Sequence, residues 1–153
     1  MNRFRGASTS TSKSRRFFAR AALVLGLAIL PAVTHAADLS VQITNIRSSA
    51  GTVHFGLYDT AADFPTSRIW QERVVPAGTP SAVFSGLAPG NYALAVFHDE
   101  NENGEFDQGF LGIPLEGYGF SNNARVFLGP PKFDEARIVL GEAGASISIA
   151  VTY

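Results

Sequence analysis

The residues best suited to chemistry lie in one acidic stretch, residues 98–123, which reads HDENENGEFDQGFLGIPLEGYGFSNN. Within it Asp99, Asn101 and Asn103 alternate at positions one, three and five, and Gly104 follows at position six. Oxygen ligands at this spacing, with a sharp bend at the sixth position, open the loops that wrap calcium in proteins. The spacing therefore predicts a cation site with oxygen ligands.

The second half of this stretch departs from the usual calcium loop. Glu105 would contribute its backbone carbonyl at position seven, and Asp107 stands at position nine, where a side chain often acts through water. Position twelve, where a bidentate glutamate is usual, is Phe110. Glu116 could supply the missing carboxylate from the far side of the loop. The predicted metal ligands are Asp99, Asn101, Asn103, Glu105, Asp107 and Glu116.

The charge of the stretch also favours a cation. Five carboxylates fall within residues 99–107, and no lysine or arginine stands among them. A divalent ion would relieve their repulsion, and an incomplete ligand set predicts weak calcium binding, with a Kd of about 10⁻⁴–10⁻³ M. Asparagine and carbonyl oxygens disfavour zinc and copper. The alternative is a loop of Asx turns that satisfies its own polar groups without an ion.

Two further features of the stretch leave alternatives open. His98 could act as a general base or a metal ligand beside Asp99, or it could make a structural hydrogen bond at the end of a strand. No serine or cysteine stands in a nucleophile-elbow motif, so no catalytic residue is predicted. Residues 117–123 alternate glycine with aromatic residues, and this segment could line a ligand groove or pack back over a sheet.

Alternation of apolar and polar residues dominates the chain after Asp38 and predicts strands rather than helices. Pro89 and Gly90 predict a type II turn with a positive φ at the glycine. Seven or eight short strands, separated by turn signals at intervals of about 8–12 residues, predict an all-β fold, a single antiparallel β-sandwich with Greek-key links of the transthyretin or immunoglobulin type. The expected strands fall at residues 39–44, 53–58, 69–75, 82–84, 92–97, 125–128, 136–140 and 146–152.

Residues 1–36 have the composition of an export signal. A basic segment without acidic residues precedes the short apolar run of residues 21–30, and small residues lead to an expected cleavage after Ala36. The apolar run is shorter than the roughly 18–20 residues needed to cross a bilayer. Arg15 and Arg16 resemble a twin-arginine signal, with a general secretory signal as the alternative. The sequence predicts a periplasmic or secreted domain of residues 37–153 without a membrane anchor.

Charge and cysteine content exclude several classes of function. After residue 36 the chain holds six basic and thirteen acidic residues, a formal charge of −7, which argues against nucleic acid and against anionic lipid as partners. The chain has no cysteine, so disulfides and thiol chemistry are excluded. The expected partner is an envelope or extracellular ligand, and the oligomeric state stays open.

The blocks GTVHFGLYD, FSGLAPGNYALAVFHDENENGEFD, LGIPLEGYGFSNN and GPPKFDEARIVL, within about residues 39–151, resemble the bacterial family called domain of unknown function 2141. The resemblance implies a small exported β-sandwich protein, and GLAPGNY is also similar to transthyretin-like and carboxypeptidase-regulatory-like sandwiches. It implies no activity.

The residues and the resemblance together predict a non-catalytic binding or accessory module of the cell envelope. Its calcium-ordered loop would present residues 111–123 to a partner. One alternative is a small periplasmic hydrolase for a glycan or phosphate ester that uses the acidic loop and Glu116. The other is a structural subunit that assembles through the strand edge of residues 145–153.

Overall fold

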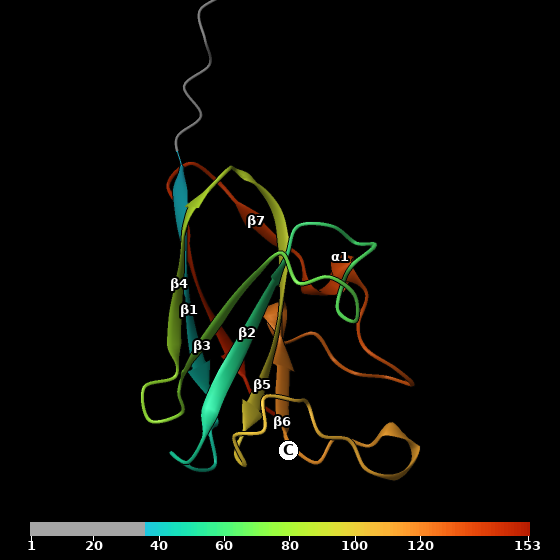
Figure 1. The fold of residues 1–153 in the computed structure, drawn as a ribbon. Helices are drawn as coiled ribbons and strands as arrows, with labels where there is room; N and C mark the ends of the chain where they lie inside the picture. The colour runs from blue at the N-terminus through green and yellow to red at the C-terminus, as the bar shows by residue number, and fades with distance from the viewer. Residues whose placement is uncertain (1–35) are drawn as a thin grey trace, which may run out of the picture. The chain divides into compact units, whose positions relative to one another are not determined.

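The computed structural model describes residues 36–153, which are mostly β-structure (Figure 1). The predicted export signal lies outside the described residues apart from Ala36, after which the cleavage is expected. Within the described part no helix is both long and apolar enough to span a bilayer. The elements are β1 (Ala37–Thr44), β2 (Thr52–Tyr58), β3 (Gln71–Pro76), β4 (Ser81–Leu87), β5 (Gly90–Asp99), the 3₁₀ turn η1 (Phe110–Gly112), β6 (Gly117–Phe120), the 3₁₀ turn η2 (Ser121–Asn123), α1 (Phe133–Ala136), β7 (Ile138–Leu140) and β8 (Ala145–Ala150).

The strands form two sheets. One has three strands in the order β4-β1-β8, and the other has five, in the order β3-β2-β5-β6 with β7 also paired to β5. Every pairing of these strands is antiparallel except that of β1 with β8, which is parallel. The predicted all-β class is confirmed, and the number of strands agrees, although β6 falls where no strand is expected and the expected strand at residues 125–128 is absent. A wholly antiparallel arrangement is wrong for the pair of β1 and β8. Periodicity defines the faces of a strand, but it carries no information on which strand becomes its neighbour.

Alternate side chains of the strands form one core that draws on both sheets, as the period of two predicts. On β2, Val53, Phe55 and Leu57 are fully buried, and Gly56 lies on the opposite face between them. Burying each large apolar side chain contributes about 1.5–3 kcal/mol to stability. Other fully buried side chains of the core are Leu39, Phe84, Leu87, Leu94, Leu140 and Ile149.

The outer face of β5 is apolar as well. Ala93 belongs to a second, smaller cluster with Tyr58, Phe64 and Ala136. At the end of β6, the Ser121 hydroxyl accepts a hydrogen bond from the Leu94 N–H (2.9 Å) and donates one to the Ala136 carbonyl. The serine thus ties α1 to the outer face of the five-stranded sheet.

Three local predictions are wrong. Residues 125–128 form an exposed loop instead of a strand, and Leu128 at its tip is 96% exposed with a φ of 55°. Ala136 ends a helical turn instead of opening a strand. Gly90 has no positive φ and begins β5 opposite Leu140, so the type II turn does not form. The hydrogen bonds that β5 makes with β7 here determine the backbone conformation of Gly90.

The alternation of glycine and aromatic residues in β6 has a packing explanation. A Cβ at Gly119 would lie 2.9 Å from Ile149 Cγ2 and 3.0 Å from the Ala150 carbonyl oxygen. The glycine face therefore lets β6 approach the C-terminal strand, and backbone hydrogen bonds of 2.9 Å in both directions join Tyr118 to Thr152. The aromatic side chains of β6 occupy the opposite face.

We predict that Gly119→Ala lowers the free energy of unfolding by about 1–3 kcal/mol, because the neighbouring backbone oxygen has to move. Urea denaturation measures the change. Gly141→Ala is the matched control, since no atom lies within 4 Å of a Cβ at that position and its φ is not positive. Equal stability of the two variants would show that close packing of β6 on β8 is not required.

Candidate functional site

The acidic loop begins where β5 ends, at Asp99, and its geometry is organised by that side chain. Asp99 is 1% exposed. Its Oδ1 accepts a hydrogen bond from the Asn103 N–H (3.2 Å), and its Oδ2 accepts one from the Gly104 N–H (2.8 Å). Gly104 has a φ of 78°, so the bend expected at the sixth position is present. The loop therefore folds back around the Asp99 carboxylate.

The two asparagines of the loop bring Asp107 into the same cluster. Asn101 Oδ1 accepts from the Asn103 N–H (3.0 Å), and Asn103 Oδ1 accepts from the Glu105 N–H (2.8 Å). Their side-chain amides donate to Asp107 Oδ2 at 2.8 and 3.1 Å. The Glu105 residue is exposed, so only its backbone lies within this arrangement.

Glu116 reaches the loop from the residue before β6. It is only 5% exposed, and its Oε2 accepts a hydrogen bond from the Asp107 N–H (3.1 Å). Its Oε1 is buried and has no hydrogen-bond partner in the described structure. Burial raises the pKa of Glu116, and the carboxylates of Asp99 and Asp107 raise it further, whereas the backbone N–H groups of Asp107 and Glu100 lower it. The structure thus brings Asp99, Asp107 and Glu116 together.

The cluster formed by the acidic loop and Glu116 combines carboxylate and amide oxygens. Within residues 36–153, no three Asp, Glu, His or Cys side chains form a metal-binding group by themselves. Amide oxygens complete the donor set, and an oxygen that accepts one N–H has a second lone pair. Hydrogen bonds within the loop satisfy the Asp99, Asn101 and Asn103 oxygens without an ion. They provide no hydrogen-bond donor for Glu116 Oε1, although buried polar atoms in native proteins rarely lack a partner.

His98 is fully buried and acts as a structural residue. Its Nε2 lies 2.8 Å from the Ala50 carbonyl, which requires the Nε2–H tautomer, and Nδ1 then accepts from the Tyr153 hydroxyl (2.7 Å). Both ring nitrogens are engaged, which favours the structural role over a general base.

His54, on the outer face of β2, lies beside the acidic loop. Its ring stacks on Phe97 with a centroid distance of 4.4 Å. Its Nε2 is 3.6 Å from Asp99 Oδ2, and its Nδ1 is 3.4 Å from Glu72 Oε1. The pairing of His54 with Phe97 across β2 and β5 creates this arrangement. Sequence patterns contain no signal for it, because it depends on strand register.

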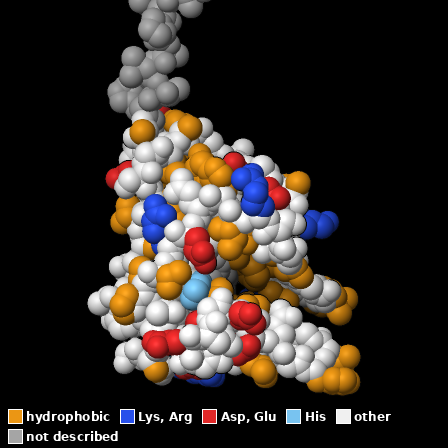
Figure 2. Space-filling model, viewed as in Figure 1, with side chains coloured by type: hydrophobic (Ala, Val, Ile, Leu, Met, Phe, Trp, Pro, Cys, Tyr) orange, Lys and Arg blue, Asp and Glu red, His pale blue; other side chains and the backbone are white. Residues whose placement is uncertain are grey.

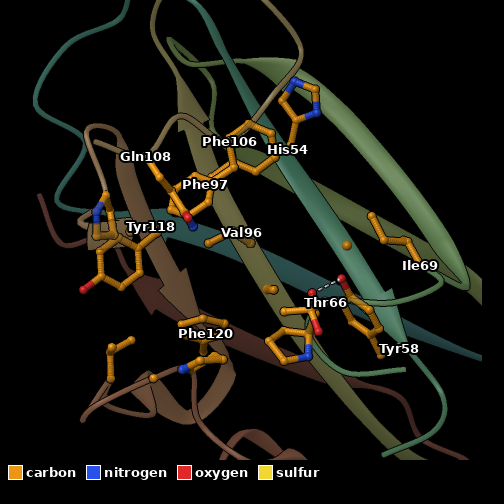
Figure 3. Close-up of a pocket in the computed structure, with 18 of the residues that line it drawn as sticks. His54, Tyr58, Thr66, Ile69, Val96, Phe97, Phe106, Gln108, Tyr118 and Phe120 are labelled. Carbon is orange, nitrogen blue, oxygen red and sulfur yellow. Dashed lines mark hydrogen bonds between the residues drawn. The ribbon is translucent and has the colours of Figure 1, made fainter. Parts of the chain in front are cut away.

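A cavity of about 760 Å³ lies on the outer face of the five-stranded sheet (Figure 3). Gly56 on β2 and Ala95 on β5 are paired in register, and their small size leaves space above the sheet, so they form the floor of the cavity. The walls come from residues 65–72, from larger side chains of β2, β5 and β6, and from two loops, residues 106–114 and 126–130. Its volume is in the range of small-molecule binding sites. No local sequence pattern predicts the cavity, because its walls come from segments that are far apart in the chain.

Aromatic rings connect the cavity to the acidic loop. Phe106, between the loop ligand positions seven and nine, contacts Phe97 and Tyr118 with centroid distances of 5.6 and 6.1 Å. Tyr118 in turn contacts Phe120 at 6.2 Å. Residues 117–123 therefore do both things that the sequence left open, since their glycines pack on β8 and their aromatic side chains line a cavity.

We predict that Glu116→Gln raises the free energy of unfolding of the metal-free protein at neutral pH by about 1–2 kcal/mol, because a neutral amide is cheaper to bury than an unpaired charge. Urea denaturation in the presence of a chelator measures this. Glu102→Gln, at an exposed position of the same loop, is the control and should be neutral.

The gap between Glu116→Gln and the wild type should depend on pH. Because the folded-state pKa of Glu116 is raised, its favourable contribution is fully present below the ordinary value of 4.5 and is lost as pH rises through the folded-state pKa. The variant lacks this titration. The difference in unfolding free energy between the variant and the wild type therefore grows between the unfolded-state and the folded-state pKa of Glu116 and is constant at higher pH. A difference that shrinks at higher pH would contradict a raised folded-state pKa for Glu116.

Comparison with known proteins gives one match. The family model described as "Uncharacterized protein conserved in bacteria (DUF2141)" matches residues 41–148. No curated protein and no solved structure matches the chain. The matched residues include β5, the whole acidic loop, Glu116 and β6. Since they make up more than half of the sequence, the chain belongs to the bacterial family DUF2141.

Proposed function

We propose that this protein is a non-catalytic binding module of the bacterial cell envelope whose acidic loop is ordered by one calcium ion. The observation that carries the proposal is Glu116 Oε1, a buried carboxylate oxygen without a partner at the edge of the loop. Asp107 is hydrogen-bonded to the other oxygen of the same carboxylate. Calcium would supply the partner that the chain does not provide.

The electrostatic argument supports an ion rather than an additional hydrogen bond. Asp99 and Glu116 are both nearly inaccessible to solvent, and Asp107 is hydrogen-bonded to Glu116 directly and linked to Asp99 through Asn103. Burying like charges without compensation is costly, and an oxygen-coordinated divalent cation compensates all three. The remaining donors are the amide oxygens of Asn101 and Asn103 and the Glu105 carbonyl. Calcium accepts six to eight such oxygens in flexible geometry.

The burial of Glu116 argues against the hydrolase. A catalytic acid must reach the substrate, and this carboxylate is 5% exposed. His98 has no free ring nitrogen to replace it. Assembly through residues 145–153 has less support than binding, because the side of this segment that faces away from β1 is partly occupied: Thr152 pairs with Tyr118, and the Ala150 N–H donates to Asn123 Oδ1.

Two further parts of the proposal concern architecture and location. We propose that the two sheets, which share one core, form a Greek-key sandwich of the transthyretin or immunoglobulin type. The export-signal composition of residues 1–36 supports a periplasmic or secreted location.

We predict that calcium raises the melting temperature of the protein and binds with a Kd of about 10⁻⁴–10⁻³ M by titration calorimetry. Glu116→Gln should abolish both responses. Because this variant is expected to be the more stable in the metal-free state, loss of the response cannot be attributed to unfolding.

Two controls test which atoms bind the ion. Glu105→Gln removes a loop charge but keeps the backbone carbonyl, so it should retain calcium binding. Magnesium, which requires a smaller octahedral site, should give a smaller shift than calcium. A melting temperature unchanged at about 10 mM calcium, well above the expected Kd, would refute the calcium site.

A further inference from the structure

The outer face of the five-stranded sheet has a hollow whose shape is set by side-chain size. On β2 and β5, the facing pair Gly56 and Ala95 lies between the larger pairs His54–Phe97 and Tyr58–Ala93. A Cβ at Gly56 would have the Tyr58 ring and the Ile69 side chain as its nearest neighbours, at 3.3–3.5 Å. The hollow is therefore built from small residues, with bulky side chains around it (Figure 3).

The sides of the cavity are mostly apolar and rich in aromatic rings. Tyr58 lines one end, where its hydroxyl donates to the Pro65 carbonyl (2.7 Å), so this end presents the ring rather than a free hydroxyl. Phe97, Phe106 and Tyr118 form a connected row at the other end. Rings in this arrangement favour a flat apolar ligand body.

Two loops beside the cavity carry apolar residues at their tips. Leu111 is 83% exposed and Leu128 is 96% exposed, and each has a positive φ, which leucine rarely adopts. Both residues line the cavity opening. Figure 2 shows hydrophobic atoms in the hollow and at the ends of the projecting loops. An apolar ligand bound in the hollow would offer the Leu111 and Leu128 side chains a surface to pack against.

The charge of the lining indicates the kind of ligand. Among the described residues, no lysine or arginine lines the cavity, and its one carboxylate is Glu72, whose side chain is half exposed at the rim. Aromatic faces carry negative potential and attract cations. Among the described lining residues only the His54 ring can carry a positive charge, and its Nδ1 lies 3.4 Å from Glu72 Oε1, so a carboxylate or phosphate group on a ligand would have to compete with Glu72 for it.

We propose that this cavity binds a small molecule with an apolar, ring-containing body and one cationic group. The body lies over Gly56 and Ala95, and the cation lies at the rim beside Glu72. This inference deepens the proposed function in one respect, which is its coupling to calcium. Phe106 and Gln108 line the cavity and flank Asp107, so an ion that orders the acidic loop also places this wall.

The binding test uses three probes with the same body: phenylhexylamine, phenylhexanol and phenylhexanoate. Titration calorimetry on the purified full chain with calcium should give the tightest binding for the amine, and the amine should bind about tenfold more tightly than the carboxylate. Hexylamine, which has the charge without the ring, should bind at least about tenfold more weakly than phenylhexylamine.

Two variants locate the site. Ala95→Leu fills the hollow and should weaken all three probes by at least about tenfold, whereas Ser146→Leu, on an exposed position of β8, should change none of them. Glu72→Gln should weaken the amine about fivefold and leave the alcohol unchanged. Thermal melts of each variant verify the fold, including Glu72→Gln, whose side chain is half exposed and contacts His54 Nδ1.

The outcomes separate this inference from the calcium site. Calcium binding with no binding of any probe overturns the cavity proposal and leaves the loop function intact. In the converse case, calcium causes no response and phenylhexylamine binds with the same affinity in calcium and in chelator. That result overturns the proposed calcium site and supports the cavity as a ligand site.

A third outcome would assign the surface to a membrane. The proposal is overturned if the free probes do not bind but the protein sediments with phosphatidylcholine vesicles, and if Leu111→Ser and Leu128→Ser abolish that sedimentation. Tightest binding of phenylhexanoate would also overturn it, because the charge preference would have the opposite sign.

Discussion

The structure depends on one constraint, the burial of β5 on both of its faces. Leu94, Val96 and His98 face the core, and the small residues Ala93 and Ala95 face the other way. A strand of this kind tolerates no shift in register, because a slip of one residue would exchange the two faces. The cavity floor and the start of the acidic loop at Asp99 both take their positions from it.

The close packing of the glycine face of β6 is the second constraint on the structure. Because Gly117 and Gly119 have no side chains, β6 can lie against the C-terminal segment and still pair with β5. This arrangement holds Glu116, the residue before β6, against the acidic loop. The same strand turns Tyr118 and Phe120 outward, so a packing requirement on one face produces a ligand-sized hollow on the other.

The acidic loop combines a self-sufficient turn with one incomplete group. Its Asx-type hydrogen bonds shape the loop without any ligand. Glu116 differs because it comes from outside the turn and brings an additional buried carboxyl group, whose pKa is raised by burial and whose Oε1 has no hydrogen-bond partner in the described structure. If the loop binds the proposed calcium ion, its preformed turn means that little conformational entropy is lost on binding.

The sequence by itself determined what depends on neighbours along the chain. The period of two identified most strands and the apolar character of both faces of β5, and the Asp, Asn and Gly spacing identified the bend at Gly104. The family also followed from the sequence, because its blocks are contiguous. These features are local, so short-range sterics and hydrogen bonding specify them.

Only the tertiary structure decided the features that join distant segments. These include the parallel pairing of β1 with β8, the stacking of His54 on Phe97 and the contact between Glu116 and Asp107. They also include the exposed loop at residues 125–128 and the cavity beside it. Each depends on which strands become neighbours and in which register, a choice made by burial of the whole core rather than by any local pattern.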